Sequence, residues 1–229
     1  MNLDTFEKKN DILFNDKTLL KTAFTHRSYL NEHRGEQIEH NERLEFLGDA
    51  VLELIVTEFL YKRFPNKAEG DLTLYRSALV NFTTLAEVAE ELKMGDFLLL
   101  SKGERKDTGR AREVILANAI EALIGAIYLD CGYEKTERFV ERNILSLIDK
   151  IISDGKWMDA KSRFQERAQE KTGITPNYET IGESGPDHDK HFLVAVFLGK
   201  EKIAEGKGKS KQEAEQDAAA AAIQAKNWK

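Results

Sequence analysis

The chain has 229 residues, 41% of them hydrophobic, and its 34 Lys and Arg against 40 Asp and Glu give a net charge of −6. This length allows one large or two smaller domains, and the acidic total argues against binding nucleic acid with the whole surface, although not against a local basic patch. The single cysteine, Cys131, excludes an internal disulfide and a cysteine-based zinc site. Since no apolar run approaches about 18 residues and no signal peptide is evident, the sequence predicts a cytoplasmic protein with no membrane partner.

Residues 1–152 are predicted to form an all-α domain, because their apolar residues recur with helical spacing and they contain one proline, Pro65. A linker is expected at residues 153–158, where Ser, Asp, Gly and Lys follow one another. Helices are expected near residues 17–26, 39–63, 68–92, 110–131 and 134–152, with shorter pieces at the N-terminus and around residues 96–100.

The helix expected at residues 39–63 carries a line of carboxylates. At about 100° per residue, Glu42, Glu45, Asp49 and Glu53 share one stripe, while the aliphatic side chains gather on the opposite side. Hard divalent cations prefer oxygen ligands, so this stripe indicates a metal site. A solvated acidic face is the alternative interpretation of the same pattern.

The helix expected at residues 110–131 is apolar on nearly every side and is therefore predicted to be buried. One amide, Asn118, and one carboxylate, Glu121, stand three residues apart and share a face. Gly125 continues that face without a side chain to block access. An unpaired carboxylate in such a place costs several kcal/mol or stays protonated.

Glu121 therefore needs a metal, a cation or a hydrogen-bond partner. An ion pair with Arg43, Arg110 or Arg112 is the purely structural alternative. If the two helices pack together, four oxygen-bearing side chains converge, namely Glu45, Asp49, Asn118 and Glu121. Such a set suits one or two Mg²⁺ ions, which activate water and stabilise the leaving oxygen in phosphodiester hydrolysis.

Residues 159–229 are predicted to form a small α+β domain in the order α-β-β-β-α. The expected elements are a helix at 159–172 that Gly173 ends, strands at 178–181, 192–198 and 202–205, and a last helix. A capping box, Ser210 to Glu213, starts this last helix. Its alanine-rich stretch, residues 214–225, is expected to let it lie close on the sheet.

The segment NERLEFLGDAVL, residues 41–52, resembles the signature motif of the ribonuclease III family. Other segments resemble the family's motifs in the same order, namely AEGDLT at 68–73, KGE at 102–104, GR at 109–110, EALIGAIYLD at 121–130 and the double-stranded RNA-binding domain at 159–225. The resemblance implies a helical endonuclease that cuts both strands of duplex RNA. It also implies a homodimer in which the signature helices, with Phe46, pack across a two-fold axis.

The resemblance also implies roles for five acidic residues. By position, Glu45, Asp49 and Glu121 match the family's metal-binding and catalytic carboxylates, and the catalytic roles are assigned to Asp49 and Glu121. Glu42 and Glu69 match acidic positions that support the same site.

Asn118 is a departure, because the family usually has Asp at this position. An amide oxygen can still bind Mg²⁺, but it brings no charge and cannot act as a base, so the metal is expected to bind more weakly. We predict an active enzyme that needs more Mg²⁺, with Mn²⁺ as a substitute.

RNA contacts are implied for six side chains of the second domain, namely Gln165, Gln169, His188, Lys207, Lys209 and Lys211. The lysines lie before and at the start of the last helix, where their charge and the helix N-terminus act together on phosphates. Taken alone, a solvated lysine run and surface glutamines explain the same residues.

The sequence thus predicts a Mg²⁺-dependent endoribonuclease for double-stranded RNA that leaves 5′-phosphate and 3′-hydroxyl ends and acts in rRNA processing and in the turnover of structured mRNA. The alternative is a catalytically impaired double-stranded RNA-binding scaffold, which only Asn118 supports. A purely structural helical dimer does not explain the converging acidic residues.

Overall fold

The computed structural model describes residues 3–33, 35, 37–155, 157–186 and 189–228. The chain divides into two compact units, Met1–Trp157 and Met158–Lys229. Each unit has its own hydrophobic core.

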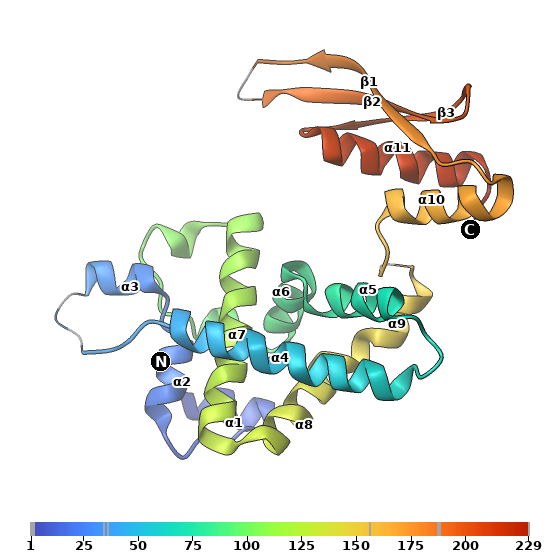
Figure 1. Ribbon diagram of the computed structural model, residues 1–229. Helices are drawn as coiled ribbons and strands as arrows, with labels where there is room; N and C mark the ends of the chain where they lie inside the picture. The colour runs from blue at the N-terminus through green and yellow to red at the C-terminus, as the bar shows by residue number, and fades with distance from the viewer. Residues whose placement is uncertain (1–2, 34, 36, 156, 187–188, 229) are drawn as a thin grey trace. The chain divides into compact units, whose positions relative to one another are not determined.

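The first unit is helical (Figure 1). Its α-helices are α1 (Leu3–Asn10), α2 (Lys17–Ala23), α3 (Arg27–Glu32), α4 (Glu42–Arg63), α5 (Glu69–Val80), α6 (Phe82–Glu91), α7 (Arg110–Cys131), α8 (Tyr133–Asn143) and α9 (Ile148–Ser153). Short 3-10 turns lie at Met94–Asp96, Glu104–Lys106 and Leu145–Leu147. The predicted all-α architecture is confirmed.

Helices α4 and α7 form the centre of this unit, and two glycines set how closely they approach. A Cβ atom on Gly48 would lie 1.8 Å from the carbonyl oxygen of Glu121, and one on Gly125 would lie 2.3 Å from the carbonyl oxygen of Leu44. Neither position has room for a side chain, so the backbones of α4 and α7 are in contact beside Glu45, Asp49 and Glu121. The expected role of Gly125, to leave the face of Glu121 accessible, is therefore wrong.

Two of the expected helices are divided. Residues 68–92 form α5 and α6, because Asn81 is extended (φ −68°, ψ 155°) and its side chain accepts a hydrogen bond from the Thr84 amide at 2.9 Å. An Asn N-cap starts a helix more readily than it continues one. Residues 134–152 likewise divide near Ile144 into α8, the 3-10 turn Leu145–Leu147 and α9.

Helix α7 is long and apolar enough to cross a membrane by length and composition alone, contrary to the expectation of no such run. However, 61% of its apolar window is buried inside the unit, and the side chains from Ala122 to Ile127 are fully enclosed. Its composition is therefore that of a central core helix, as its sequence predicted.

The second unit has the order α-β-β-β-α, which confirms the prediction (Figure 1). Its elements are α10 (Ala160–Thr172), β1 (Asn177–Ser184), β2 (His191–Leu198), β3 (Glu201–Gly208) and α11 (Lys211–Ala225). The strands form an antiparallel sheet in the order β1-β2-β3. A Cβ atom on Gly206 would lie 2.0 Å from the Ala218 amide nitrogen, so the alanine-rich face of α11 does lie directly on the sheet.

Candidate functional site

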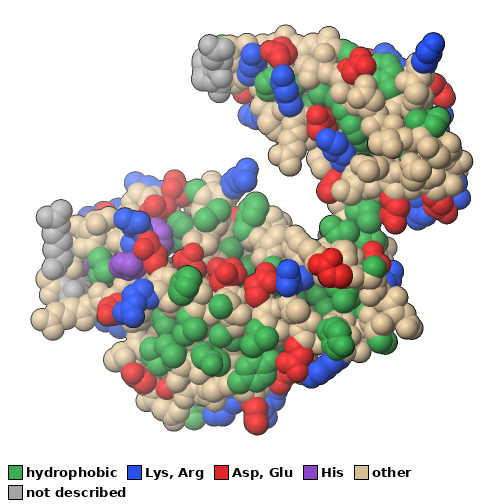
Figure 2. All heavy atoms as spheres, viewed as in Figure 1, with side chains coloured by type: hydrophobic (Ala, Val, Ile, Leu, Met, Phe, Trp, Pro, Cys, Tyr) green, Lys and Arg blue, Asp and Glu red, His purple; other side chains and the backbone are tan. Residues whose placement is uncertain are grey.

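Acidic side chains follow α4 across the face of the first unit shown in Figure 2, beside a patch of hydrophobic side chains. Glu45 is half-buried on this helix, and Asp49 is exposed one turn further along. Burial raises the pKa of Glu45, and the negative charges of Glu42 and Asp49 raise it further. A carboxyl group whose pKa is raised by neighbouring negative charges marks a place where a cation is favoured.

Glu121 on α7 shares this electrostatic environment. Burial raises its pKa to about 7, and the charges of Asp49, Glu45 and Glu53 act in the same direction. The packing of α4 on α7 therefore brings Glu45, Asp49 and Glu121 within electrostatic reach of one another.

The structural alternative for Glu121, an ion pair with a nearby arginine, is not found. Arg43 pairs with Glu39 at 3.8 Å. Arg112 donates a hydrogen bond to the carbonyl oxygen of Gly95 at 3.3 Å. The third candidate, Arg110, lies over the ring of Phe82 at 5.4 Å. Among the described residues, none forms an ion pair or a hydrogen bond with the Glu121 side chain, so none of them offsets its charge.

Asn118 lies half-buried one turn before Glu121 on α7. Its side chain forms no hydrogen bond with any other described residue, so its amide oxygen is free to accept a ligand.

The side chains of Glu45, Asp49, Asn118 and Glu121 offer the type of ligand atom that a hard divalent cation binds. These atoms are carboxylate and amide oxygens, the two least exposed carboxyl groups have raised pKa values, and nothing described in the chain neutralises them. In the described part of the chain, however, no three His, Cys, Asp or Glu side chains are gathered closely enough to hold a metal ion by themselves. Asn118 and water would have to complete the ligand shell.

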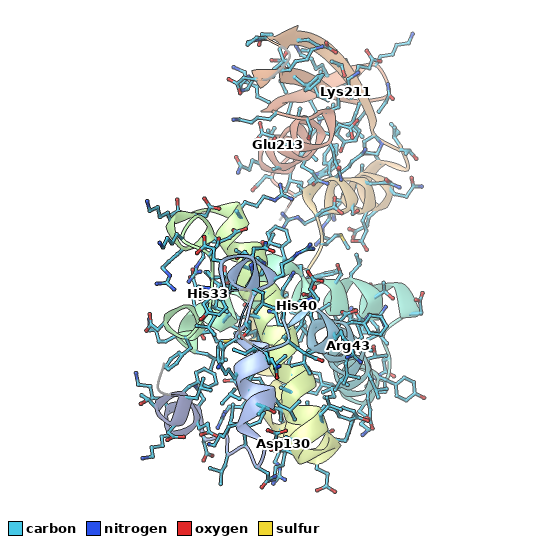
Figure 3. The ribbon with its side chains drawn as sticks, turned by 90° about the vertical axis from the view of Figure 1, so that its left-hand side faces the viewer. His33, His40, Arg43, Asp130, Lys211 and Glu213 are labelled. Carbon is cyan, nitrogen blue, oxygen red and sulfur yellow. The ribbon has the colours of Figure 1, made fainter. Side chains whose placement is uncertain are left out.

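Two acidic residues with predicted supporting roles have other partners. Glu42 accepts a hydrogen bond from Arg27 at 3.2 Å and lies 3.8 Å from His40; Figure 3 shows His40 near Arg43, which is on the first turn of α4. Glu69 is exposed at the start of α5 and accepts a hydrogen bond from Thr73 at 2.9 Å. The charge of Glu42 raises the pKa of Glu45, whereas Glu69 is not among the groups that raise the pKa of Glu45 or Glu121.

Arg27 was not identified from the sequence. It belongs to α3, 15 residues before Glu42, and no local spacing links the two residues.

The side chain of Phe46 is 81% exposed on α4, an unusual position for a large apolar residue. It borders a recess between α2, the start of α4 and the end of α7, which is lined in part by Leu19, Ile38, Leu47 and Leu129. An exposed aromatic beside an apolar recess is typical of a protein–protein contact.

In the second unit, the lysines predicted to bind RNA are exposed on β3, the following turn and the start of α11. Lys209 pairs with Asp189 at 3.5 Å, and Lys211 lies 3.8 Å from Glu183. Figure 3 shows Lys211 and Glu213 at the start of α11. The Ser210 side chain caps this helix by accepting a hydrogen bond from the Glu213 amide at 3.1 Å.

The remaining predicted RNA contacts lie on other elements. Gln165 and Gln169 are exposed one turn apart on α10, and Lys207 is exposed on β3. His188 lies outside the described residues.

Comparison with known proteins identifies the family of each unit. Residues 16–148 match the family model described as ribonuclease-III-like, and residues 160–226 match the double-stranded RNA binding motif. The chain belongs to the ribonuclease III family. The resemblance found in its sequence is thereby confirmed.

Individual members of the ribonuclease III family are similar over nearly the whole chain. Ribonuclease 3 of Borreliella afzelii is 46% identical over 97% of this chain and 91% of its own length. Ribonuclease 3 of Streptococcus uberis is 46% identical over 93% of each. The solved nuclease domain of ribonuclease III from Campylobacter jejuni is 43% identical with a TM-score of 0.55, and the match covers 62% of this chain and 98% of that domain. That nuclease domain is described as flexible in a region involved in dimer formation.

Proposed function

We propose that this ribonuclease III family member is a Mg²⁺-dependent endoribonuclease that hydrolyses both strands of double-stranded RNA and leaves 5′-phosphate and 3′-hydroxyl ends. Its natural substrates would be rRNA precursors and structured mRNA in the cytoplasm. The observation that carries the catalytic part is Glu121, a largely buried carboxyl group whose pKa is raised to about 7 by burial and by the charges of Asp49, Glu45 and Glu53.

Glu45, Asp49, Asn118 and Glu121 would hold the metal, and Mn²⁺ would be accepted by the same oxygen ligands. When bound, Mg²⁺ supplies an activated water and stabilises the leaving oxygen. The chain's own contribution is to hold these oxygens on two helices that touch at Gly48 and Gly125, so that the site is rigid before substrate arrives. Glu42, fixed by Arg27, would support the site through its charge on Glu45. Glu69 is proposed as a supporting acidic residue outside this electrostatic group.

The two units would act on the same duplex. The lysines around the start of α11 would bind phosphates, and Gln165 and Gln169 would reach the minor groove, which is how such modules recognise A-form shape. We also propose a homodimer through α4, with Phe46 of each copy buried in the contact.

Asn118 favours one other candidate, a double-stranded RNA-binding scaffold with impaired catalysis. The two proposals differ in what Glu121 does, and Glu121→Gln separates them. For an enzyme, this substitution should lower the rate of duplex cleavage by at least about a thousandfold, because it removes a charged metal ligand, and should leave duplex affinity unchanged within about twofold. A scaffold would show no metal-dependent cleavage before or after the change.

A further inference from the structure

Two lysines of the second unit share one carboxylate. Nζ of Lys190 lies 2.8 Å from Oε2 of Glu183, and Nζ of Lys211 lies 3.8 Å from Oε1 of the same residue. The three residues come from different segments: Glu183 is near the end of β1, Lys190 directly precedes β2, and Lys211 is the first residue of α11. The fold, and not the local sequence, brings the two ammonium groups together.

A phenylalanine holds both ammonium groups in place. Nζ of Lys190 and Nζ of Lys211 each lie 5.7 Å from the centre of the Phe192 ring, within the range of a cation–π contact. Phe192 itself packs against the core of the second unit, so the ring is a fixed base. Two cations fixed side by side repel each other unless an anion lies between them, and here Glu183 supplies that anion.

The electrostatics of Glu183 agree with this geometry. The hydrogen bond from Lys190 is the largest influence on its pKa and lowers it, and the positive charges of Lys190 and Lys211 act in the same direction against the opposing effect of burial. The carboxylate therefore stays ionised near neutral pH. A phosphodiester oxygen carries the same charge and makes the same kind of charge-assisted hydrogen bond to an ammonium group.

We propose that Lys190 and Lys211 form one phosphate-binding site on Phe192, and that Glu183 occupies this site until a phosphate of double-stranded RNA displaces it. This inference rests on the proposed RNA-binding function and adds two residues to it: Lys190 as a phosphate contact and Glu183 as an internal competitor. Binding is then an exchange of anions, so the free energy gained from these lysines is reduced by the ion pairs that must break. Asp189, which pairs with Lys209, acts on the neighbouring lysine in the same way.

The chain offers a matched control pair on the same sheet. Nζ of Lys202 lies 2.9 Å from Oε1 of Glu205 on β3, in an exposed Lys–Glu pair of the same net charge. The register places Lys202 opposite Phe197, five residues along β2 from Phe192, which is about 16 Å away at the rise of a strand. Lys202→Gln and Glu205→Gln therefore change the charge of the domain equally without touching the proposed site.

The test is the affinity of the full chain for a fluorescently labelled RNA duplex, measured by anisotropy in EDTA so that no metal-dependent cleavage occurs, over a range of salt concentrations. Lys190→Gln should raise Kd about fivefold and reduce the slope of log Kd against log salt by about one, as expected for the loss of one phosphate contact. Glu183→Gln should lower Kd by about threefold or more. The control variants should change Kd by less than about twofold.

The inference is overturned if Lys190→Gln behaves like Lys202→Gln, or if Glu183→Gln fails to tighten binding more than Glu205→Gln does. Both tested side chains are about 40% exposed, so the substitutions leave the core intact, and the circular dichroism spectrum checks this. Failure of the unsubstituted chain to bind the duplex would overturn the RNA-binding function as well. If the variants show the predicted changes in duplex affinity but the unsubstituted chain does not cleave the duplex in Mg²⁺, only the proposed catalysis is overturned.

Discussion

The ionised side chain of Glu121 destabilises the folded protein when no metal is bound. The ordinary pKa of 4.5 is raised to about 7 by burial and by three neighbouring carboxylates. Between these two pH values the folded chain binds more protons than the unfolded chain, so the free energy of unfolding must fall as the pH rises. Above pH 7 Glu121 is ionised in the folded chain as well, so the full loss in the free energy of unfolding is present.

This gives a prediction for stability. In EDTA, the protein should be less stable at pH 8 than at pH 5 by about 2 kcal/mol, a value reduced from the full pKa shift because water partly screens the site. Urea unfolding at the two pH values measures the difference. Glu121→Gln should remove most of it, and Mg²⁺ should restore stability at pH 8 in the unsubstituted chain. An equal pH dependence in the variant would show that Glu121 is not the group responsible.

Asn118 is the second decisive residue. If its amide oxygen is a metal ligand, Asn118→Asp adds a negative charge to the site and should lower the Mg²⁺ concentration for half-maximal cleavage by about tenfold. A Mg²⁺ titration of the cleavage rate measures this. The exposed Asn66, between α4 and α5, provides the control substitution Asn66→Asp. An unchanged Mg²⁺ midpoint in Asn118→Asp would contradict the ligand role.

At the scale of elements, the contact between α4 and α7 determines the geometry of the site. Gly48→Ala would place a methyl group 1.8 Å from the Glu121 carbonyl oxygen, so the helices would have to separate. Overpacking against backbone should cost about 3 kcal/mol in the free energy of unfolding and should also lower the cleavage rate, because Glu45 and Asp49 move relative to Glu121.

The control for this change is Gly70→Ala on α5, where an added Cβ atom meets nothing within 4 Å. Gly70→Ala should raise the free energy of unfolding by less than about 1 kcal/mol. Urea unfolding of both variants makes the comparison. Equal stability of Gly48→Ala and the unsubstituted chain would show that the helices can move apart without cost.

The bounds of the two central helices and the burial of α7 could be predicted from the sequence, whereas contacts between distant segments could not. The bounds of α4 and α7 follow closely from their apolar patterns, and the burial of Glu121 follows from the composition of α7. The break at Asn81 was missed because apolar spacing continues across it. The absence of an arginine partner for Glu121 among the described residues and the contact of Gly125 with Leu44 depend on how distant segments pack, which no local pattern records.

At the scale of the whole molecule, the exposed Phe46 predicts self-association. A two-fold contact buries the same residue on both copies, so Phe46→Asp should weaken the dimer by at least about a hundredfold at roughly 1.5–3 kcal/mol for each buried ring. Sedimentation analysis of the full chain measures the dimer Kd. Leu13, which is 74% exposed between α1 and α2, provides the control Leu13→Asp. A monomeric unsubstituted chain at micromolar concentration would contradict the prediction.

The most direct test of the central claim is a Mg²⁺ titration of cleavage on a long perfect RNA duplex, with single-stranded RNA of the same sequence beside it. We expect cutting of the duplex only, at a rate that rises with Mg²⁺ to a plateau, and products with 5′-phosphate and 3′-hydroxyl ends. Tight duplex binding without cleavage at any Mg²⁺ or Mn²⁺ concentration would contradict it and make this chain a binding protein.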